Sequence, residues 1–257
     1  MHLNHLTFFA PGNSPAVTFA RKALLRKGCR VVEAPGPDVT HLLLSVPSFA
    51  PDGTPKGGFL LEDILKEIPD TVTVMGGNLP ESMSEKYNCV DFLRDPMYLA
   101  ENAGITAHCA ISVATQELKC TFQDMHILVI GWGRIGKCLS KLLKSLGAHV
   151  TVTSRKAEDR AILAALGYDA LDPSTLNVNL SRYRLIFNTA PTVVIDEEKC
   201  RFLRCDCLKI DLASKPGILC PDVIWARGLP GKRAPETSGE LIARTAVRLA
   251  FEQGGKP

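Results

Sequence analysis

The sequence predicts an α/β protein of two lobes, in which helices cover parallel strands. Short apolar stretches of strand length alternate along the chain with longer amphipathic stretches, as in parallel sheets that are buried on both faces. Hydrophobic residues make up 46% of the 257 residues and charged residues 22%, so the chain can bury a sizeable core. This length suits two modest domains, and residues 106–120 form a helical stretch long enough to link them.

The first half of the chain is expected to form one lobe, residues 1–105. Residues 6–10 predict a buried strand, after which Ser14 and Pro15 suit the start of a helix that Gly28 ends. Apolar and amphipathic runs predict further strands at residues 31–32, 42–46 and 71–75, and a helix at residues 60–68. Residues 91–104 are expected to form a crossing segment that leads to the second lobe.

The second lobe, residues 106–257, carries the clearer pattern. After the linking helix, the apolar periodicity predicts strands at residues 126–130, 150–153, 185–187, 207–210 and 223–225, and helices at residues 135–146 and 157–166. A last helix is expected at residues 236–252, and it can return to the first lobe. Strands that alternate with helices in this way predict a doubly wound parallel sheet.

A glycine-rich turn carries the strongest functional signal. A G-x-G-x-x-G pattern lies directly between a strand and an amphipathic helix, which is the context that a Rossmann dinucleotide site requires. It consists of Gly131, Trp132, Gly133, Arg134, Ile135 and Gly136. The first glycine allows a tight turn, the second lets backbone approach a diphosphate, and the third lets the helix pack close to the strand. Free backbone amides and the positive end of the helix dipole then face the phosphates. The alternative is a tight turn that binds no ligand.

The end of the next strand favours NADP over NAD. An NAD site usually places Asp or Glu at this point to hold the ribose 2′-hydroxyl, whereas this chain has Ser154, Arg155 and Lys156. A hydroxyl and two cations would attract a 2′-phosphate, which a carboxylate would repel. Asp159 lies close enough to leave NAD open, and a solvated basic loop is the alternative interpretation.

Three loops are expected to meet at the carboxyl ends of the strands, where open parallel sheets bind ligands. They are residues 188–191, 211–217 and 228–237, all polar and interrupted by proline or glycine. Lys215 and Lys232 can clamp an anionic substrate or the diphosphate there, or lie solvated at the surface. His108, on the linking helix, can exchange a proton near neutral pH, or be an ordinary packed or solvated histidine.

Composition argues against several other classes of protein. The net charge is only +3 and no long Lys/Arg run occurs, which argues against a nucleic-acid surface. No apolar run reaches the ~20 residues that span a bilayer, and the first five residues do not resemble a signal peptide, so a cytoplasmic location is expected. The nine cysteines are expected to stay reduced, and the spacing of Cys200, Cys205, Cys207 and Cys220 matches no zinc pattern, so no metal is expected.

Taken together, residues 131–136, 211–217 and 228–237 resemble the A-subunit family of dipicolinate synthase from spore-forming bacteria. Few other dinucleotide-binding families carry both of the last two segments, and the resemblance is good over residues 102–249. It implies a flavodoxin-like N-terminal lobe beside the Rossmann lobe. It also implies NADP- or NAD-dependent oxidation of a dihydrodipicolinate-type precursor to dipicolinate during sporulation, with a partner, a flavoprotein-like B subunit. A homodimer is the default assembly for proteins of this build.

The resemblance and the loop positions assign roles to particular residues. The carboxylates of a small dicarboxylate substrate are expected to meet Asn102, Thr106, Ser214 and Lys215. Lys215 and His108 are the candidate catalytic groups. Besides the glycine-rich turn and residues 154–156, the dinucleotide is expected to contact Asn188, Thr189, Ala190, Pro191, Asp211, Leu229 and Pro230.

One departure from the family pattern leaves the substrate open. After the position of Asn102 the family usually reads Pro-Thr-x-Glu-Gly, whereas residues 105–109 place His108 and Cys109 at the last two positions. Two alternatives to the dipicolinate reaction therefore remain. One is a divergent NADP-dependent oxidoreductase that acts on another small carboxylate. The other is a non-catalytic, dinucleotide-binding regulatory subunit.

Overall fold

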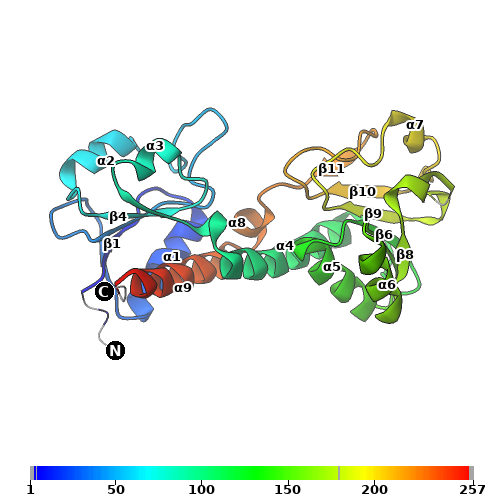
Figure 1. Ribbon diagram of the computed structural model, residues 1–257, viewed down its shortest axis with the longest axis horizontal. Coiled ribbons are helices and arrows are strands. Elements are labelled where there is room, and N and C mark those ends of the chain that lie inside the picture. Colours follow the sequence, from blue (N-terminus) through cyan, green and yellow to red (C-terminus); the bar gives the residue numbers. More distant parts are fainter. Residues whose placement is uncertain (1–2, 4, 179, 255–257) are drawn as a thin grey trace. The chain divides into compact units, whose positions relative to one another are not determined.

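The computed structural model describes residues 3, 5–178 and 180–254, and it contains two parallel sheets (Figure 1). The expectation about a signal peptide rests partly on residues 1, 2 and 4, which lie outside the described residues. The chain divides into two compact units, Met1–Asn102 with Pro230–Pro257, and Ala103–Leu229. The first unit is therefore built from both ends of the chain, whereas the second is one continuous stretch.

The sheet of the first unit has five parallel strands in the order β2-β1-β3-β4-β5. The strands are β1 (Thr7–Phe9), β2 (Arg30–Val32), β3 (His41–Leu43), β4 (Thr73–Gly76) and β5 (Asn88–Asp91). This is the strand order of flavodoxin-like folds, which confirms the fold class predicted for the N-terminal lobe. The fifth strand was not predicted, because its sequence, Asn-Cys-Val-Asp, lacks an apolar run.

Helices cover both faces of this sheet (Figure 1). On one face lie α2 (Leu61–Glu67) and α3 (Glu81–Ser84), and on the other α1 (Pro15–Arg26) and α9 (Pro235–Gly254). The side chains of Leu61 and Ile64 join a buried cluster with strand residues such as Leu42 and Val74. A β-carbon at Gly239 of α9 would come within 2.5 Å of the carbonyl oxygen of Ala16, so this glycine lets α9 pack closely against α1.

Ion pairs hold α9 in the first unit. Arg26 of α1 pairs with Glu240, and Arg244 pairs with Glu101. Arg248 contacts Asp95 and also Glu252, its nitrogen 3.0 Å from the Glu252 carboxylate. Most of these charges are partly exposed, so the apolar contact of α9 with α1 contributes more to stability than the ion pairs do.

The second unit contains a six-stranded parallel sheet in the order β11-β10-β9-β6-β7-β8. The strands are β6 (His126–Ile130), β7 (His149–Thr153), β8 (Asp169–Leu171), β9 (Leu185–Asn188), β10 (Leu208–Asp211) and β11 (Val223–Trp225). In this unit the first strand, β6, lies between the second, β7, and the fourth, β9. That reversal of order is the Rossmann arrangement, as predicted.

The two faces of the second sheet are covered differently. The helices α5 (Arg134–Ser145) and α6 (Ala157–Ala165) lie on one face (Figure 1). On the other, the short 3₁₀ helices η2 (Pro173–Val178) and η3 (Leu180–Arg182) bring Leu176 and Leu180 against Leu128 and Ile186. The crossover from β8 to β9 therefore runs through 3₁₀ turns rather than through a full α-helix.

The structure of residues 91–104 differs from the prediction. It was expected to be a crossing segment, but after η1 (Phe92–Arg94) one helix, α4 (Pro96–Glu117), runs through it. Asp95 accepts a hydrogen bond from the backbone amide of Tyr98 at 2.8 Å, as an N-cap does. Pro96 stands at the first helical position, where it needs no hydrogen-bond partner. The boundary between the two units falls inside α4, at residues 102–103.

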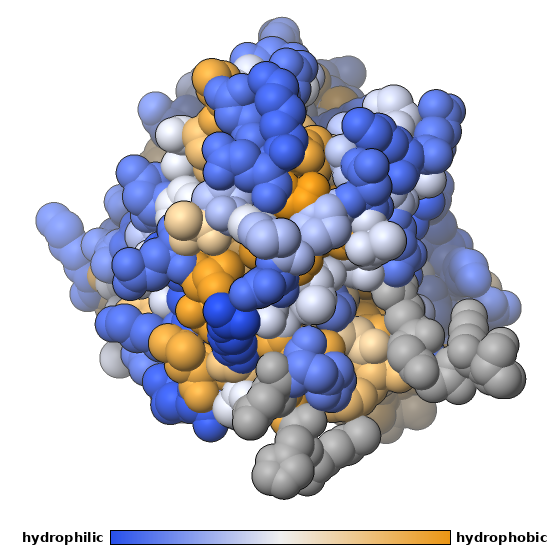
Figure 2. All heavy atoms as spheres, turned by 90° about the vertical axis from the view of Figure 1, so that its left-hand side faces the viewer, coloured by the Kyte–Doolittle hydropathy of each residue, from blue (hydrophilic) through white to orange (hydrophobic). Residues whose placement is uncertain are grey.

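Three short α-helices were not predicted, namely α3, α7 (Glu197–Cys200) and α8 (Leu229–Arg233). Of the described residues, no helix has the length and apolar character needed to cross a membrane, and no cluster of three or more His, Cys, Asp or Glu side chains could hold a metal ion. Figure 2 shows one face, on which hydrophilic side chains predominate and hydrophobic areas lie between them.

Candidate dinucleotide site

The turn between β6 and α5 has the backbone shape that its glycines allow. Gly131 has a φ of +102°, and a β-carbon there would lie 2.7 Å from Thr189 Oγ1. A β-carbon at Gly136 would lie 2.1 Å from the carbonyl oxygen of Gly131, so only glycine permits this close packing of helix and turn. Gly133 differs, because a β-carbon there would meet no atom within 4 Å. Its missing side chain leaves open space in front of the first turn of α5.

Gly133 opens onto a pocket of about 550 Å³ at the carboxyl ends of β6, β7 and β9. This is the place where the strand order reverses, which is where open α/β sheets bind ligands. The lining residues are Ile130, Gly131, Trp132, Gly133, Thr153, Ser154, Arg155, Lys156, Asp159, Pro173, Ser174, Thr189, Ala190, Pro191, Thr192, Val193, Val194 and Lys199. The structure thus brings together nine predicted dinucleotide contacts, those from residues 131–133, 154–156 and 189–191.

Hydrogen bonds between strand ends fix the floor of the pocket. The amide of Gly131 donates to Thr153 Oγ1 at 3.2 Å, which ties the turn to the end of β7. Thr189 Oγ1 donates to the carbonyl oxygen of Ile130 at 2.9 Å, which ties the turn to the end of β9. The glycine-rich turn is therefore braced from both neighbouring strands. Such bracing keeps the pocket in shape before a ligand enters.

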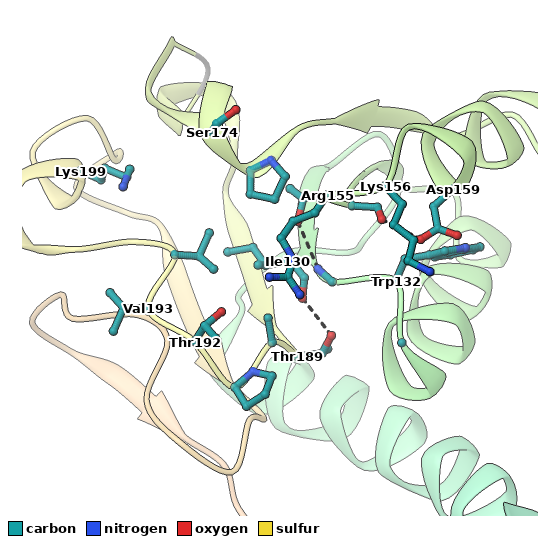
Figure 3. A pocket seen from close by; sticks show the side chains of 18 residues that line it. Ile130, Trp132, Arg155, Lys156, Asp159, Ser174, Thr189, Thr192, Val193 and Lys199 are labelled. Atoms are coloured by element: carbon teal, nitrogen blue, oxygen red, sulfur yellow. Dashed lines mark hydrogen bonds between the residues drawn. The ribbon is translucent and has the colours of Figure 1, made fainter.

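Two walls of different character face each other across the pocket (Figure 3). Lys156 and Asp159 lie on one side with Trp132, whereas Val193 and Lys199 lie on the other. The first wall carries charged side chains beside an aromatic ring, and the second combines valines with Lys199. A dinucleotide needs both kinds of surface, because its phosphates are anionic and its adenine ring is flat and largely apolar.

A hydrogen-bond network orders the charged wall. Ser154 is buried, and its hydroxyl donates to Asp159 Oδ2 at 2.8 Å. Arg160 donates from Nη1 to the carbonyl oxygens of Ser154 at 2.7 Å and Arg155 at 2.8 Å. The same guanidinium lies 2.9 Å from the carboxylate of Asp172. The backbone of residues 154–155 is thereby held, while the side chains of Arg155 and Lys156 remain exposed at the rim.

Lys199 and Ser174 also line the pocket, and the sequence did not indicate either. Lys199 Nζ lies 2.9 Å from the carboxylate of Asp196. The backbone amide of Lys199, and then its ammonium, hold the pKa of Asp196 below its usual value. Hydrogen bonds from the side chain and amide of Ser174 likewise lower the pKa of Asp172, with a smaller contribution from the charge of Arg160. Both carboxylates are therefore ionised at neutral pH, and Lys199 carries a neutralising partner.

Asn188 and Asp211 lie at the ends of β9 and β10, outside the pocket lining. Their polar atoms bond to each other and to backbone: Asn188 accepts from the amide of Ala190 at 3.1 Å and donates to its carbonyl oxygen at 3.0 Å. Asp211 accepts from the amides of Gly217 at 2.7 Å and Ile218 at 3.2 Å. These two side chains shape the loops behind the pocket.

The other predicted site residues are spread over several elements, and none of them lines the pocket described here. Asn102, Thr106 and His108 lie on α4, where Thr106 is buried and His108 is exposed. Ser214 and Lys215 are exposed on the loop after β10. Arg134, Ile135 and Gly136 form the start of α5, and Leu229 and Pro230 form the start of α8, with Leu229 buried.

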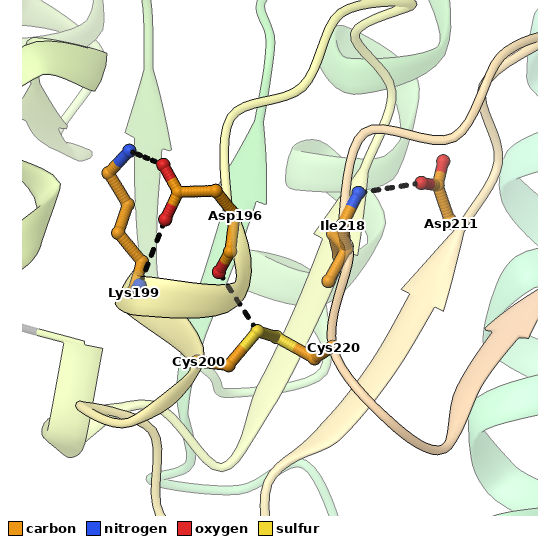
Figure 4. The surroundings of a disulfide bond; sticks show 6 residues. All are labelled: Asp196, Lys199, Cys200, Asp211, Ile218 and Cys220. Carbon is orange, nitrogen blue, oxygen red and sulfur yellow. Dashed lines mark hydrogen bonds and ion pairs between the residues drawn. A yellow bond between two sulfur atoms is a disulfide. The ribbon is translucent and has the colours of Figure 1, made fainter.

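One prediction about the cysteines was wrong. Cys200 at the end of α7 and Cys220 in the loop after β10 form a disulfide (Figure 4). The other seven cysteines are free thiols, of which Cys205 and Cys120 are exposed. Burial raises the pKa of Cys207 to about 11, so that this thiol stays protonated at neutral pH. The disulfide joins two segments already paired through backbone, since the amide of Leu219 donates to the carbonyl oxygen of Ile195 at 2.8 Å.

No protein-family model matches the chain. In sequence it is similar to the dipicolinate synthase A subunit of Bacillus subtilis, with 24% identity over 245 residues, 87% of this chain and 82% of that protein. In fold it is similar to the dipicolinate synthase A subunit of Bacillus halodurans, with a TM-score of 0.84, 21% identity and 100% of both chains covered. L-alanine dehydrogenase has a TM-score of 0.66 and 10% identity, with 98% of this chain and 90% of that chain covered. The predicted resemblance to the dipicolinate synthase A subunits is thus confirmed.

Proposed function

We propose that this chain is the A subunit of a dipicolinate-forming oxidoreductase and that it uses NADP to oxidise a dihydrodipicolinate-type precursor to dipicolinate. In this reaction the precursor loses a hydride and a proton, and NADP⁺ becomes NADPH. The product ring is aromatic, so the reaction is favourable. The protein then has mainly to align the ring with the dinucleotide and to bind two carboxylates.

The observation that carries this proposal is the open space in front of Gly133, between the first turn of α5 and a basic rim. Backbone amides of the turn can donate to a diphosphate without any side chain in the way. Arg155 and Lys156 supply charge for a 2′-phosphate, and Val193 and Val194 supply apolar surface for an adenine ring. The similarity to dipicolinate synthase A subunits supports the choice of substrate.

The nicotinamide, when bound, supplies the hydride-accepting carbon. In the proposal, Asn102, Thr106, Ser214 and Lys215 bind the carboxylates of the substrate, and Lys215 or His108 takes up the proton. His108 is exposed on α4, and so it is accessible to solvent protons. A flavoprotein-like B subunit would be the partner, as for the family that the chain resembles.

The departure at His108 and Cys109 supports a second candidate function, oxidation of a different small carboxylate with the same dinucleotide. Cys109 is buried, so it contributes packing rather than a polar group at that position. The third candidate, a regulatory subunit that binds the dinucleotide without turnover, shares the pocket but not the chemistry.

Binding and turnover test the proposal separately. Trp132 lines the pocket, and Trp225 is the only other tryptophan of the chain. In a Trp225→Phe variant, all tryptophan emission comes from Trp132. Bound NADPH should therefore quench this emission, and the fluorescence of NADPH should rise through energy transfer from Trp132. Absence of binding of any nicotinamide dinucleotide would overturn the whole proposal.

The turnover experiment uses the chain together with its B-type partner, the dihydrodipicolinate precursor and NADP⁺. Dipicolinate and NADPH should appear in equal amounts. If other small dicarboxylates are oxidised but the precursor is not, the second candidate function is correct. If NADP binds and no dicarboxylate is oxidised, the regulatory function is correct.

A further inference from the structure

Asp159 occupies an unusual position for a residue beside a 2′-phosphate site. It lies in the first turn of α6, is half-buried, and lines the same pocket as Arg155 and Lys156. Figure 3 shows its carboxylate next to Lys156, on the same wall as Trp132. The sequence favours NADP because no carboxylate directly follows β7. The fold nevertheless brings a carboxylate to the pocket, because Asp159 follows Ser154 by five residues and lines the same pocket.

The hydrogen bond between Ser154 and Asp159 changes what the serine can offer a ligand. A hydroxyl has one proton to donate, and that of Ser154 is directed at Asp159 Oδ2 at 2.8 Å. Toward the pocket, Ser154 and Asp159 therefore both present acceptors. A ribose 2′-hydroxyl can donate to either of them, whereas a 2′-phosphate has acceptor oxygens and a negative charge that the carboxylate repels.

The same wall thus carries groups with opposite effects on a 2′-phosphate. Arg155 and Lys156 attract a phosphate, and their side chains are exposed. The carboxylate of Asp159 can accept a hydrogen bond from a ribose that carries no 2′-phosphate. It is half-buried, so water screens its charge less than it screens the charges of Arg155 and Lys156. Arg160 fixes the backbone between them, through the carbonyl oxygens of Ser154 and Arg155.

We propose that Asp159 is a specificity-determining residue. It accepts a hydrogen bond from the 2′-hydroxyl of an unphosphorylated dinucleotide, and so it keeps the site open to NAD while Arg155 and Lys156 admit NADP. The inference rests on the proposed dinucleotide function, and it adds the residue that limits the choice between the two ligands.

The test compares the Kd of NADPH with the Kd of NADH for the full chain and for Asp159→Asn. Asparagine keeps the shape of the side chain and an oxygen that can accept from Ser154, so the wall should keep its structure while it loses the charge. We expect NADPH to bind more tightly and NADH more weakly, so that the ratio of the two constants shifts about tenfold toward NADPH.

Glu158→Gln is the matched control. Glu158 carries the same charge one position earlier on α6, is exposed, and lies 3.9 Å from Lys156 Nζ, but it does not line the pocket. Its removal should leave the ratio within about twofold, since an exposed charge is well screened. Ser154→Ala adds a second measurement: NADH binding should survive, because Asp159 remains to accept the ribose hydroxyl.

The outcomes distinguish the two proposals. If the unmodified chain binds both dinucleotides and Asp159→Asn leaves the ratio unchanged, or shifts it as Glu158→Gln does, the role of Asp159 is overturned and the proposed function stands. If the unmodified chain binds neither dinucleotide, both are overturned. If it binds them but forms no dipicolinate, only the proposed reaction fails, because the ratio is measured by binding alone.

Discussion

The carboxylate of Asp211 accepts a hydrogen bond from the side-chain amide of Asn188 at 2.9 Å, and both side chains are buried. The pair joins the ends of β9 and β10. Asp211 also accepts from the backbone amides of Ala213, Gly217 and Ile218, at 3.0, 2.7 and 3.2 Å. A buried carboxylate that accepts from this many donors holds the loop around it together, so Asp211 is the centre of this loop.

Replacement of Asp211 by alanine should destabilise the protein. The change leaves buried amide donors without an acceptor, so we expect the free energy of unfolding to fall by about 3–5 kcal/mol. Urea unfolding of both proteins measures this loss. Asp206→Ala is the control. Asp206 is an exposed carboxylate paired with Arg204, so its removal should lower the free energy of unfolding far less than the removal of Asp211 does. Equal losses would show that Asp211 is not the centre of the loop.

Gly133→Ala should separate ligand binding from folding. The added β-carbon would enter open space in the pocket, and the φ of this residue, −78°, suits alanine. We expect an unchanged melting temperature and a Kd for NADPH that is at least about tenfold higher, because the methyl group occupies the approach of the diphosphate. Gly36→Ala, which also meets no atom within 4 Å, controls for the substitution itself. Undiminished NADPH affinity would place the ligand elsewhere.

Arg155→Ala should weaken NADPH more than NADH. A charge-assisted contact to a 2′-phosphate is worth about 1–2 kcal/mol, which corresponds to a factor of about ten in Kd. NADH lacks that phosphate and should lose little. Titration of both ligands measures the effect, with Arg182→Ala as a control outside the pocket lining. Parallel losses for the two ligands would remove Arg155 from the 2′-phosphate site.

Loss of the Cys200–Cys220 disulfide should lower stability. The bond closes a loop of 20 residues, and cross-links of that span contribute about 3 kcal/mol. A Cys200→Ser/Cys220→Ser variant should unfold at lower denaturant concentration, whereas Cys205→Ser, which removes an exposed free thiol, should not. Alkylation of the unfolded, unreduced chain should label seven of its nine cysteines. Labelling of all nine would contradict the bond.

His41 should make the first unit less stable in mild acid. Burial, with a smaller effect of the nearby His5, lowers the pKa of His41 to about 4, from 6.5 in the unfolded chain. Between these values the unfolded state binds a proton that the folded state rejects. The free energy of unfolding should therefore fall as pH drops from 6.5 to 4, by up to about 3 kcal/mol, and then level off.

Melting temperatures of the unmodified protein and of His41→Gln, at about pH 7 and pH 4.5, measure this effect. The glutamine does not titrate, so the variant should lose less of its stability over this interval. His149→Gln removes an exposed histidine and serves as the control. An identical pH dependence in the unmodified protein and His41→Gln would exclude His41 as the cause.

The elements that the sequence predicted best are those in which local pattern and buried position agree. The β6 strand, the glycine-rich turn and α5 combine an apolar run, a turn motif and a 3.6-residue period, and they lie within one residue of the expected bounds. Strands β5 and β8 were missed because edge strands need no apolar run. The first turns of α4 were missed, although Pro96 is typical of a first helical position.

The candidate site was predictable where it is local and not where it depends on tertiary contacts. The glycines and residues 154–156 follow their strands directly, so their place at the sheet edge could be inferred. Lys199 reaches the pocket from α7, and no pattern in the chain marks it, whereas Asp159 was noticed only because it lies close to residues 154–156 in sequence. Asn188 and Asp211 also follow their strands directly, but they lie outside the pocket lining. Their side chains bond to the backbone of the loops that follow them. The Cys200–Cys220 disulfide could not be predicted, because the spacing of two cysteines along the sequence does not show whether they lie close together in the fold.

The two-segment build of the first unit has a consequence for synthesis on the ribosome. Residues 103–229 are complete before any of α9 has been made, so the dinucleotide unit can fold while the N-terminal sheet still lacks the helix that packs on α1. A translation product that stopped at residue 229 would retain the glycine-rich turn, yet it would leave the apolar side of α1 uncovered. Exposed surface of that kind is recognised by chaperones and proteases, so such a fragment should be degraded even though its ligand pocket is whole.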